Sequence, residues 1–154
     1  MFAAPLGILL LSPPKIEVMV FELSECPLAN AYSSTLRRIT KEFPSISFEL
    51  VFEDEDLGFS AAIKHARSFD WNRGVRVDPK HALALRFGAK VSPEAFVVVD
   101  GKVAYQGRID DRYPVPSIRR SKVGVHDLEN ALRRCLKGDT RFRKTQAIGC
   151  VLPV

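Results

Sequence analysis

Cys26 and Pro27 are the neighbouring residues best suited to chemistry in this 154-residue sequence. Proline fits the first position of a helix, because its fixed φ suits a helix start and its missing N–H is one that the first turn leaves unpaired. The cysteine before it therefore lies at a helix N-terminus, where free N–H groups and the helix dipole stabilise a thiolate. Lowering a thiol pKa from ~8.5 to ~6.5 raises its reactive fraction at pH 7 about 25-fold. A small buried cysteine at a strand-to-helix junction is the alternative interpretation.

Two predicted strands and one predicted helix position Cys26. Residues 16–23 have the pattern of an apolar core strand. Residues 27–42 have the pattern of an amphipathic helix that ends before Pro44. Residues 45–52 are rich in β-branched and aromatic side chains, which favours a second strand. Strands joined by one helix are expected to lie parallel in the same sheet.

The rest of the chain adds helices and a hairpin to this unit. Three further helices are predicted, at residues 58–69, 78–87 and 126–137. Asp100-Gly101 is a strong hairpin signal and predicts a turn between strands at residues 94–99 and 102–109. Residues 110–125 are charged and contain Pro and Gly, so they are expected to form a loop.

Other polar residues and the remaining helix cysteine suggest structural roles. The acidic run at residues 53–56 precedes a helix, so its carboxylates are expected to face the helix dipole, with a divalent-cation site as the alternative. Asp78 is predicted to be an N-cap. His65 and His81 are expected at the surface. Cys135 lies on the apolar face of the last helix, which predicts a buried and inert thiol.

The length and apolar content predict one domain, placed at residues 16–138. Residues 1–15 form an N-terminal segment, interpreted as a signal remnant or a misassigned start, and its apolar run is too short to cross a bilayer. Residues 139–154 form a C-terminal tail that carries Cys150.

The net charge of +5 is unevenly spread, because residues 105–154 alone carry +6. A nucleic-acid-binding module would combine such basic residues with exposed aromatic ones in a recognisable pattern, and this stretch lacks that pattern. A basic face that attracts an acidic partner is the better interpretation.

Four segments of the chain resemble one branch of the thioredoxin superfamily, the redoxins of the AhpC/TSA-like, thiol-disulfide isomerase-like group: CPLAN, DPKHALALRFGAKVSPEAFVVVDGKVAYQGRIDDRY, HDLENAL and TQAIGC. The likeness covers about residues 16 to 151. It implies an α/β protein of thioredoxin-like fold, with a central mixed β-sheet flanked by helices and no cofactor. By the same likeness, Pro93 is a cis-proline that faces Cys26. Such redoxins are often exported in bacteria, which favours an exported or periplasmic location over a cytoplasmic one.

Two positions depart from the superfamily pattern. Dithiol members carry a second cysteine three residues after the first, where this chain has Ala29. Peroxiredoxins carry a threonine three residues before the reactive cysteine, where this chain has Leu23. Peroxidase activity is therefore the less favoured reaction. Regeneration of Cys26 falls to Cys150, to an external thiol or to another protein.

Three functions are open on these grounds. The first is thiol-disulfide exchange on protein disulfides or small thiols, with Cys26 as nucleophile, Cys150 as resolving cysteine and Pro93 beside them. Its expected substrate-binding residues are Pro27, Ser92, Arg108 and Arg112. The second is a metal-delivery module in which Cys26, Cys150 and His126 hold Cu(I). The third is an adaptor of thioredoxin-like fold without chemistry, whose basic last third binds a partner.

Cys150 is predicted to form a disulfide with Cys26. It is the only other cysteine not assigned to a helix core, and Gly149 before it allows a close backbone approach. Such a bond is either redox-active or a permanent staple, which would stabilise the fold by up to about 5 kcal/mol for a loop of ~125 residues. Absence of the bond would favour an external thiol or a metal.

Overall fold

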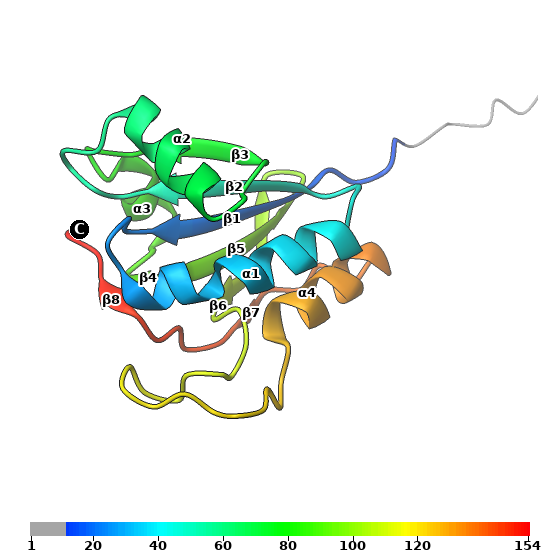
Figure 1. The fold of residues 1–154 in the computed structure, drawn as a ribbon. Coiled ribbons are helices and arrows are strands. Elements are labelled where there is room, and N and C mark those ends of the chain that lie inside the picture. The colour runs from blue at the N-terminus through cyan, green and yellow to red at the C-terminus, as the bar shows by residue number, and fades with distance from the viewer. Residues whose placement is uncertain (1–11) are drawn as a thin grey trace, which may run out of the picture.

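The computed structural model describes residues 12–154 (Figure 1). In chain order the elements are β1 (Ile16–Glu22), α1 (Pro27–Glu42), β2 (Ser47–Phe52), α2 (Phe59–Ser68), β3 (Gly74–Val77), α3 (Ala82–Phe87), β4 (Val91–Ser92), β5 (Glu94–Val99), β6 (Lys102–Gly107), α4 (Asp127–Leu136), β7 (Arg143–Lys144) and β8 (Cys150–Val151). Most of the predicted N-terminal segment, residues 1–15, lies outside the described part. Among the helices of residues 12–154, none is long and apolar enough to span a membrane.

A six-stranded mixed sheet forms the centre of the fold, in the order β3-β2-β1-β5-β6-β7. β1, β2 and β3 are parallel, as expected for strands connected through helices, and β5 is antiparallel to β1. β5 and β6 form the predicted hairpin, in which Asp100 and Gly101 have φ angles of 49° and 81°. β4 and β8 make a separate two-stranded sheet. The predicted α/β architecture is confirmed.

Each face of the sheet is covered by an apolar layer. On one face, Val18 and Val20 belong to the larger core cluster, together with residues of α1, α2 and α4. Figure 1 shows α1 and α4 running side by side across this face. On the other face, Phe21 and Phe96 belong to a second cluster that includes α3 and Leu152 of the tail. The change of layer between Val20 and Phe21 follows from the two-residue period of a strand.

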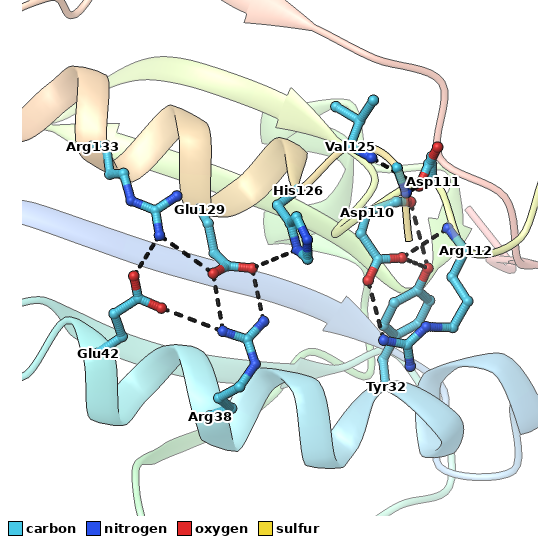
Figure 2. A network of polar contacts seen from close by, with 11 residues as sticks. Tyr32, Arg38, Glu42, Asp110, Asp111, Arg112, Val125, His126, Glu129 and Arg133 are labelled. Atoms are coloured by element: carbon cyan, nitrogen blue, oxygen red, sulfur yellow. Dashed lines mark hydrogen bonds and ion pairs between the residues drawn. The ribbon is translucent and has the colours of Figure 1, made fainter. Parts of the chain in front are cut away.

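A polar network joins α1 to α4 (Figure 2). The buried carboxylate of Glu129 in α4 accepts hydrogen bonds of 3.0 and 2.8 Å from Arg38 in α1, and it also contacts His126. The Arg38 guanidinium is the main reason why the pKa of Glu129 falls to about 2. Glu42 and Arg133 extend the network between the helices. Because two parallel bonds constrain direction as well as distance, this network fixes α4 relative to α1.

The region around α3 differs from the sequence prediction. The helix expected over residues 78–87 begins only at Ala82, and its N-cap is His81 in a left-handed conformation with φ 56°. Asp78 still satisfies the helix start, because its carboxylate accepts hydrogen bonds from the N–H groups of residues 82–84. The sequence prediction also lacked β3, a four-residue edge strand that pairs with β2.

Candidate active site

Cys26 is the N-cap of α1 and follows the last residue of β1, Glu22, by four positions. The turn before it is held by a hydrogen bond of 3.0 Å from the Cys26 N–H to the Leu23 carbonyl. Ser24 in the same turn donates to Asp54 through its N–H and its hydroxyl, at 2.9 and 2.7 Å. Pro27 occupies the first helical position, as predicted, and is exposed. Cys26 is only 2% exposed, so these contacts place a covered sulfur at a helix N-terminus.

Cys26 and Cys150 form a disulfide, with their Cα atoms 6.1 Å apart and 124 positions apart in the chain. The predicted pairing is therefore confirmed. Cys150 belongs to β8, which runs antiparallel to β4 and places Cys150 opposite Ser92. Unlike Cys26, Cys150 is half-buried. Cys150 is thus the more accessible residue of the pair.

Ser92 and Pro93 lie directly beside the disulfide. The peptide bond between them is cis, as the sequence resemblance implied. The Ser92 hydroxyl accepts a hydrogen bond of 2.8 Å from the Leu23 N–H, and the Ser92 carbonyl oxygen lies 3.1 Å from the Cys26 Sγ. The side chains of Ser92 and Pro93 are both buried. Ser92 therefore contacts the turn, the cysteine and the tail at once.

The tail is anchored on both sides of Cys150. The Thr145 hydroxyl lies 2.6 Å from the Tyr105 hydroxyl and accepts a hydrogen bond of 3.1 Å from the Arg108 N–H. Leu152, two residues beyond Cys150, is 3% exposed and belongs to the second core cluster. Non-covalent contacts therefore keep Cys150 near Cys26 independently of the disulfide.

Gly149 lies where no side chain fits. A Cβ at this position would overlap the Ser92 carbonyl oxygen and lie 2.6 Å from the carbonyl carbon and 3.1 Å from the Pro93 nitrogen. The close approach is between two backbones, so no side-chain adjustment relieves it. The expected role of Gly149 in bringing Cys150 to Cys26 thus has a direct steric basis.

Arg108 and Arg112 have carboxylate partners. The Arg108 guanidinium donates to Asp127 at 2.7 Å. Arg112 lies 3.4 Å from Asp110 and stacks over the ring of Tyr32, with 5.4 Å between the guanidinium carbon and the ring centre (Figure 2). Both side chains are thus held by carboxylates of the fold, and their expected role in substrate binding stays a prediction.

Two carboxylates near Cys26 were missed or misjudged from sequence. Glu22, the last residue of β1, is 5% exposed, and burial together with the nearby Asp54 raises its pKa to about 8. Asp54 binds the Cys26 turn through Ser24, so it does not serve the helix dipole as expected. The only sequence signal for Glu22 was an acidic residue at the end of an apolar strand.

We expect Glu22→Gln to make the protein more stable at alkaline pH. The folded state holds the Glu22 proton up to about pH 8, whereas the unfolded chain releases it near the ordinary pKa of 4.5. The free energy of unfolding therefore falls as pH rises between these values, by about 1.4 kcal/mol for each unit of pKa difference. Glutamine removes this dependence. Urea unfolding of the oxidised protein at pH 5 and pH 8.5 measures it, with the exposed Glu25→Gln as control. An equal effect of Glu22→Gln at both pH values would contradict the assignment.

The acidic run also contributes a buried pair. Glu53 is fully buried and its carboxylate lies 2.9 Å from the His81 Nδ1. Burial raises the pKa of Glu53 to about 7, and the contact with Glu53 raises the pKa of His81. The predictions that His81 is a surface residue and that Glu53 serves the helix dipole are wrong, because the left-handed turn at His81 brings its ring onto the end of β2.

The copper hypothesis lacks a third ligand in the described structure. Within residues 12–154, no three His, Cys, Asp or Glu side chains are grouped so that they could hold a metal ion. His126, the expected third ligand, contacts Glu129 at 3.0 Å. Of the three expected copper ligands, only the two cysteine sulfurs lie together in the described structure, and they are bonded to each other.

Comparison with known proteins shows the fold. No protein-family model matches the chain, and no curated protein matches it. A hypothetical protein from Sinorhizobium meliloti 1021 has a TM-score of 0.75 at 18% identity, over 90% of this chain and 79% of that one. An uncharacterised conserved protein from Geobacillus kaustophilus has a TM-score of 0.70 at 19% identity, over 90% and 77%. The thioredoxin domain of a thiol-disulfide oxidoreductase from Bacteroides vulgatus has a TM-score of 0.57 at 12% identity, over 79% of both chains.

The chain therefore has the thioredoxin-like fold, and its candidate site is the disulfide between Cys26, at the start of α1, and Cys150 of the tail. The narrower AhpC/TSA-like assignment stays a prediction.

Proposed function

We propose that the protein is a thiol-disulfide oxidoreductase whose exchanging pair is Cys26 and Cys150. The observation that carries this proposal is the disulfide between the N-cap of α1 and a half-buried cysteine of β8. A thiolate at Cys26 is stabilised by the helix N-terminus, which makes it both a nucleophile at neutral pH and a good leaving group. Protein disulfides or small thiols are its proposed substrates, and the basic last third favours an acidic redox partner.

In the reduced protein, the Cys26 thiolate attacks one sulfur of a substrate disulfide, and the other substrate sulfur leaves as a thiolate. Cys150 then attacks the Cys26 sulfur and releases the remaining substrate thiolate. The substrate gains two electrons and the protein ends with the Cys26–Cys150 bond. An external thiol restores the dithiol by attacking the sulfur of Cys150, the more accessible residue of the pair, so that Cys26 leaves as the stabilised thiolate.

Hydroperoxide reduction has less support. Position 23 supplies no hydroxyl, and the Leu23 N–H is already bound to the Ser92 hydroxyl. If the protein is an adaptor without chemistry, the disulfide is a permanent staple. The resistance of the bond to reductant therefore distinguishes the adaptor hypothesis from the exchange hypothesis.

We expect the Cys26–Cys150 bond of a Cys135→Ser variant to be reduced reversibly by a dithiol buffer, at a potential well above the structural range of roughly −300 mV. Helix stabilisation of the Cys26 thiolate favours the reduced form. Alkylation with an iodoacetamide mass tag at each buffer potential gives the midpoint, since the variant retains only these two cysteines. Reduction only below about −300 mV would identify a staple and reject the proposal.

A further inference from the structure

β3 forms one edge of the six-stranded sheet, beside α2 (Figure 1). Among the described strands, β2 is the only one that pairs with β3. The Asp78 N–H donates to the Phe52 carbonyl at 2.8 Å, so Arg76 and Asp78 direct their main-chain groups toward β2. Because successive residues of a strand alternate, the N–H and C=O groups of Val75 and Val77 face outward. This edge therefore leaves main-chain donors and acceptors free for a further strand.

An apolar hollow lies next to this edge, between α2 and β3. Its volume is about 320 Å³, and its lining includes Phe59, Ile63, Trp71 and Val75. Phe59 is 54% exposed, although its side chain is large and apolar. Val75 packs against the larger core cluster, on the face of the sheet that α1 and α2 cover. A strand added beside β3 places every second side chain on this face, where the apolar hollow can receive it.

A second, cationic hollow of about 420 Å³ adjoins the first where β3 begins. Arg73 lines both hollows, Arg67 lines the apolar one, and Arg37 and Lys41 line the cationic one. Among the described residues of the two linings, Asp70 is the only acidic one, and it forms an ion pair with Arg37. The charges of Lys41, Arg67 and Arg73 are therefore not balanced by a carboxylate within the hollows.

The free strand edge and the two hollows together select an extended acidic peptide. Main-chain groups at a strand edge pair with another peptide backbone, which a nucleic acid or a lipid headgroup does not supply. Three cations without carboxylates attract acidic side chains at the end of such a strand. These cations lie outside the basic last third of the chain, so they form a separate attractive surface.

We propose that the edge of β3 is a docking site for an extended acidic segment of a partner protein. The segment adds a strand beside β3, places an aliphatic side chain in the apolar hollow and brings carboxylates to Lys41, Arg67 and Arg73. The cationic hollow lies where β3 begins, whereas Cys26 follows the end of β1, and these strands are parallel. The docking site is thus at the opposite end of the sheet from the disulfide, and it does not depend on the proposed exchange function.

The test measures binding of a fluorescein-labelled peptide to the oxidised full chain by fluorescence anisotropy. The parent peptide is Asp-Glu-Ile-Thr-Ile-Glu-Asp with blocked ends, which presents acidic residues at the cationic hollow in either strand direction. One control peptide carries lysine at the acidic positions, and another is N-methylated at its three central amides. The protein variants are Lys41→Glu/Arg73→Glu and Phe59→Ser. Arg119→Glu/Lys122→Glu, which reverses two exposed loop cations, is the charge-matched control.

We expect Lys41→Glu/Arg73→Glu to bind the parent peptide at least tenfold more weakly than wild-type protein, a factor that corresponds to about 1.4 kcal/mol. Phe59→Ser should bind it about threefold more weakly, and the loop variant should bind it like wild type. Both control peptides should bind wild-type protein at least tenfold more weakly than the parent. Urea unfolding checks that each variant is folded. If Lys41→Glu/Arg73→Glu does not fold, Phe59→Ser and the N-methylated peptide still test the site.

Three results would overturn the docking site. Absence of binding by the parent peptide is the first. Equal weakening by the two charge variants is the second, because attraction would then follow net charge alone. Equal binding of the parent and N-methylated peptides is the third, because no strand would be added. Dimers of the wild-type protein that Phe59→Ser separates would identify a second copy as the occupant, against this proposal.

Discussion

Cys26→Ser should reduce thiol-disulfide exchange to the rate of the buffer without protein and leave the fold intact. Serine has nearly the same shape as cysteine, but it forms no thiolate at neutral pH. The substitution also removes the disulfide, which lowers the free energy of unfolding by up to about 5 kcal/mol on the chain-entropy model. Reduction of a dye-labelled disulfide measures exchange, and urea unfolding measures stability.

Two matched variants give the comparison for Cys26→Ser. Cys150→Ser removes the same bond but keeps the nucleophile, so it should accumulate a mixed disulfide on Cys26 that is not resolved. Cys135 is 1% exposed and burial raises the pKa of its thiol, so Cys135→Ser should keep full exchange. Burying its hydroxyl should cost on the order of 1–3 kcal/mol. Loss of exchange in Cys135→Ser, with Cys26→Ser active, would show that the site is misassigned.

Gly149→Ala should prevent the tail from reaching Cys26. The added Cβ overlaps the Ser92 carbonyl oxygen, and both groups belong to backbones that the strand pairing holds in place. Loss of β8 removes the disulfide, worth up to about 5 kcal/mol, and exposes Leu152, worth about 1.5–3 kcal/mol. Non-reducing peptide mapping measures the fraction of Cys26–Cys150 bond, and urea unfolding measures the stability.

Gly58→Ala is the matched control, because a Cβ at Gly58 meets nothing within 4 Å. It should retain the disulfide and lose no more than about 1 kcal/mol, since Gly58 is the N-cap of α2. A Gly149→Ala protein with the full disulfide content of Gly58→Ala would show that the tail adjusts to the side chain. The steric account of Gly149 would then be wrong.

Local sequence by itself determined the elements that frame the site. The apolar run that became β1, the Cys26-Pro27 helix start and the Asp100-Gly101 turn depend on residues within a few positions of each other. Propensity, capping and turn chemistry act over that range, so the sequence contains their signals. The pairing of Cys26 with Cys150 also followed from sequence, through the lack of another available cysteine.

Only the tertiary structure decided how the tail is seated. β8 and β4 are two residues long each and exist only because they pair, so neither carries a sequence pattern of its own. Their register places Cys150 opposite Ser92, and the same register requires glycine at position 149. The burial of Glu22 and the contact between Glu53 and His81 likewise depend on segments that meet only in the folded chain. Contacts between segments that are distant in the sequence bury these groups and set the environment of the disulfide. The spacing of residues along the sequence does not encode such contacts.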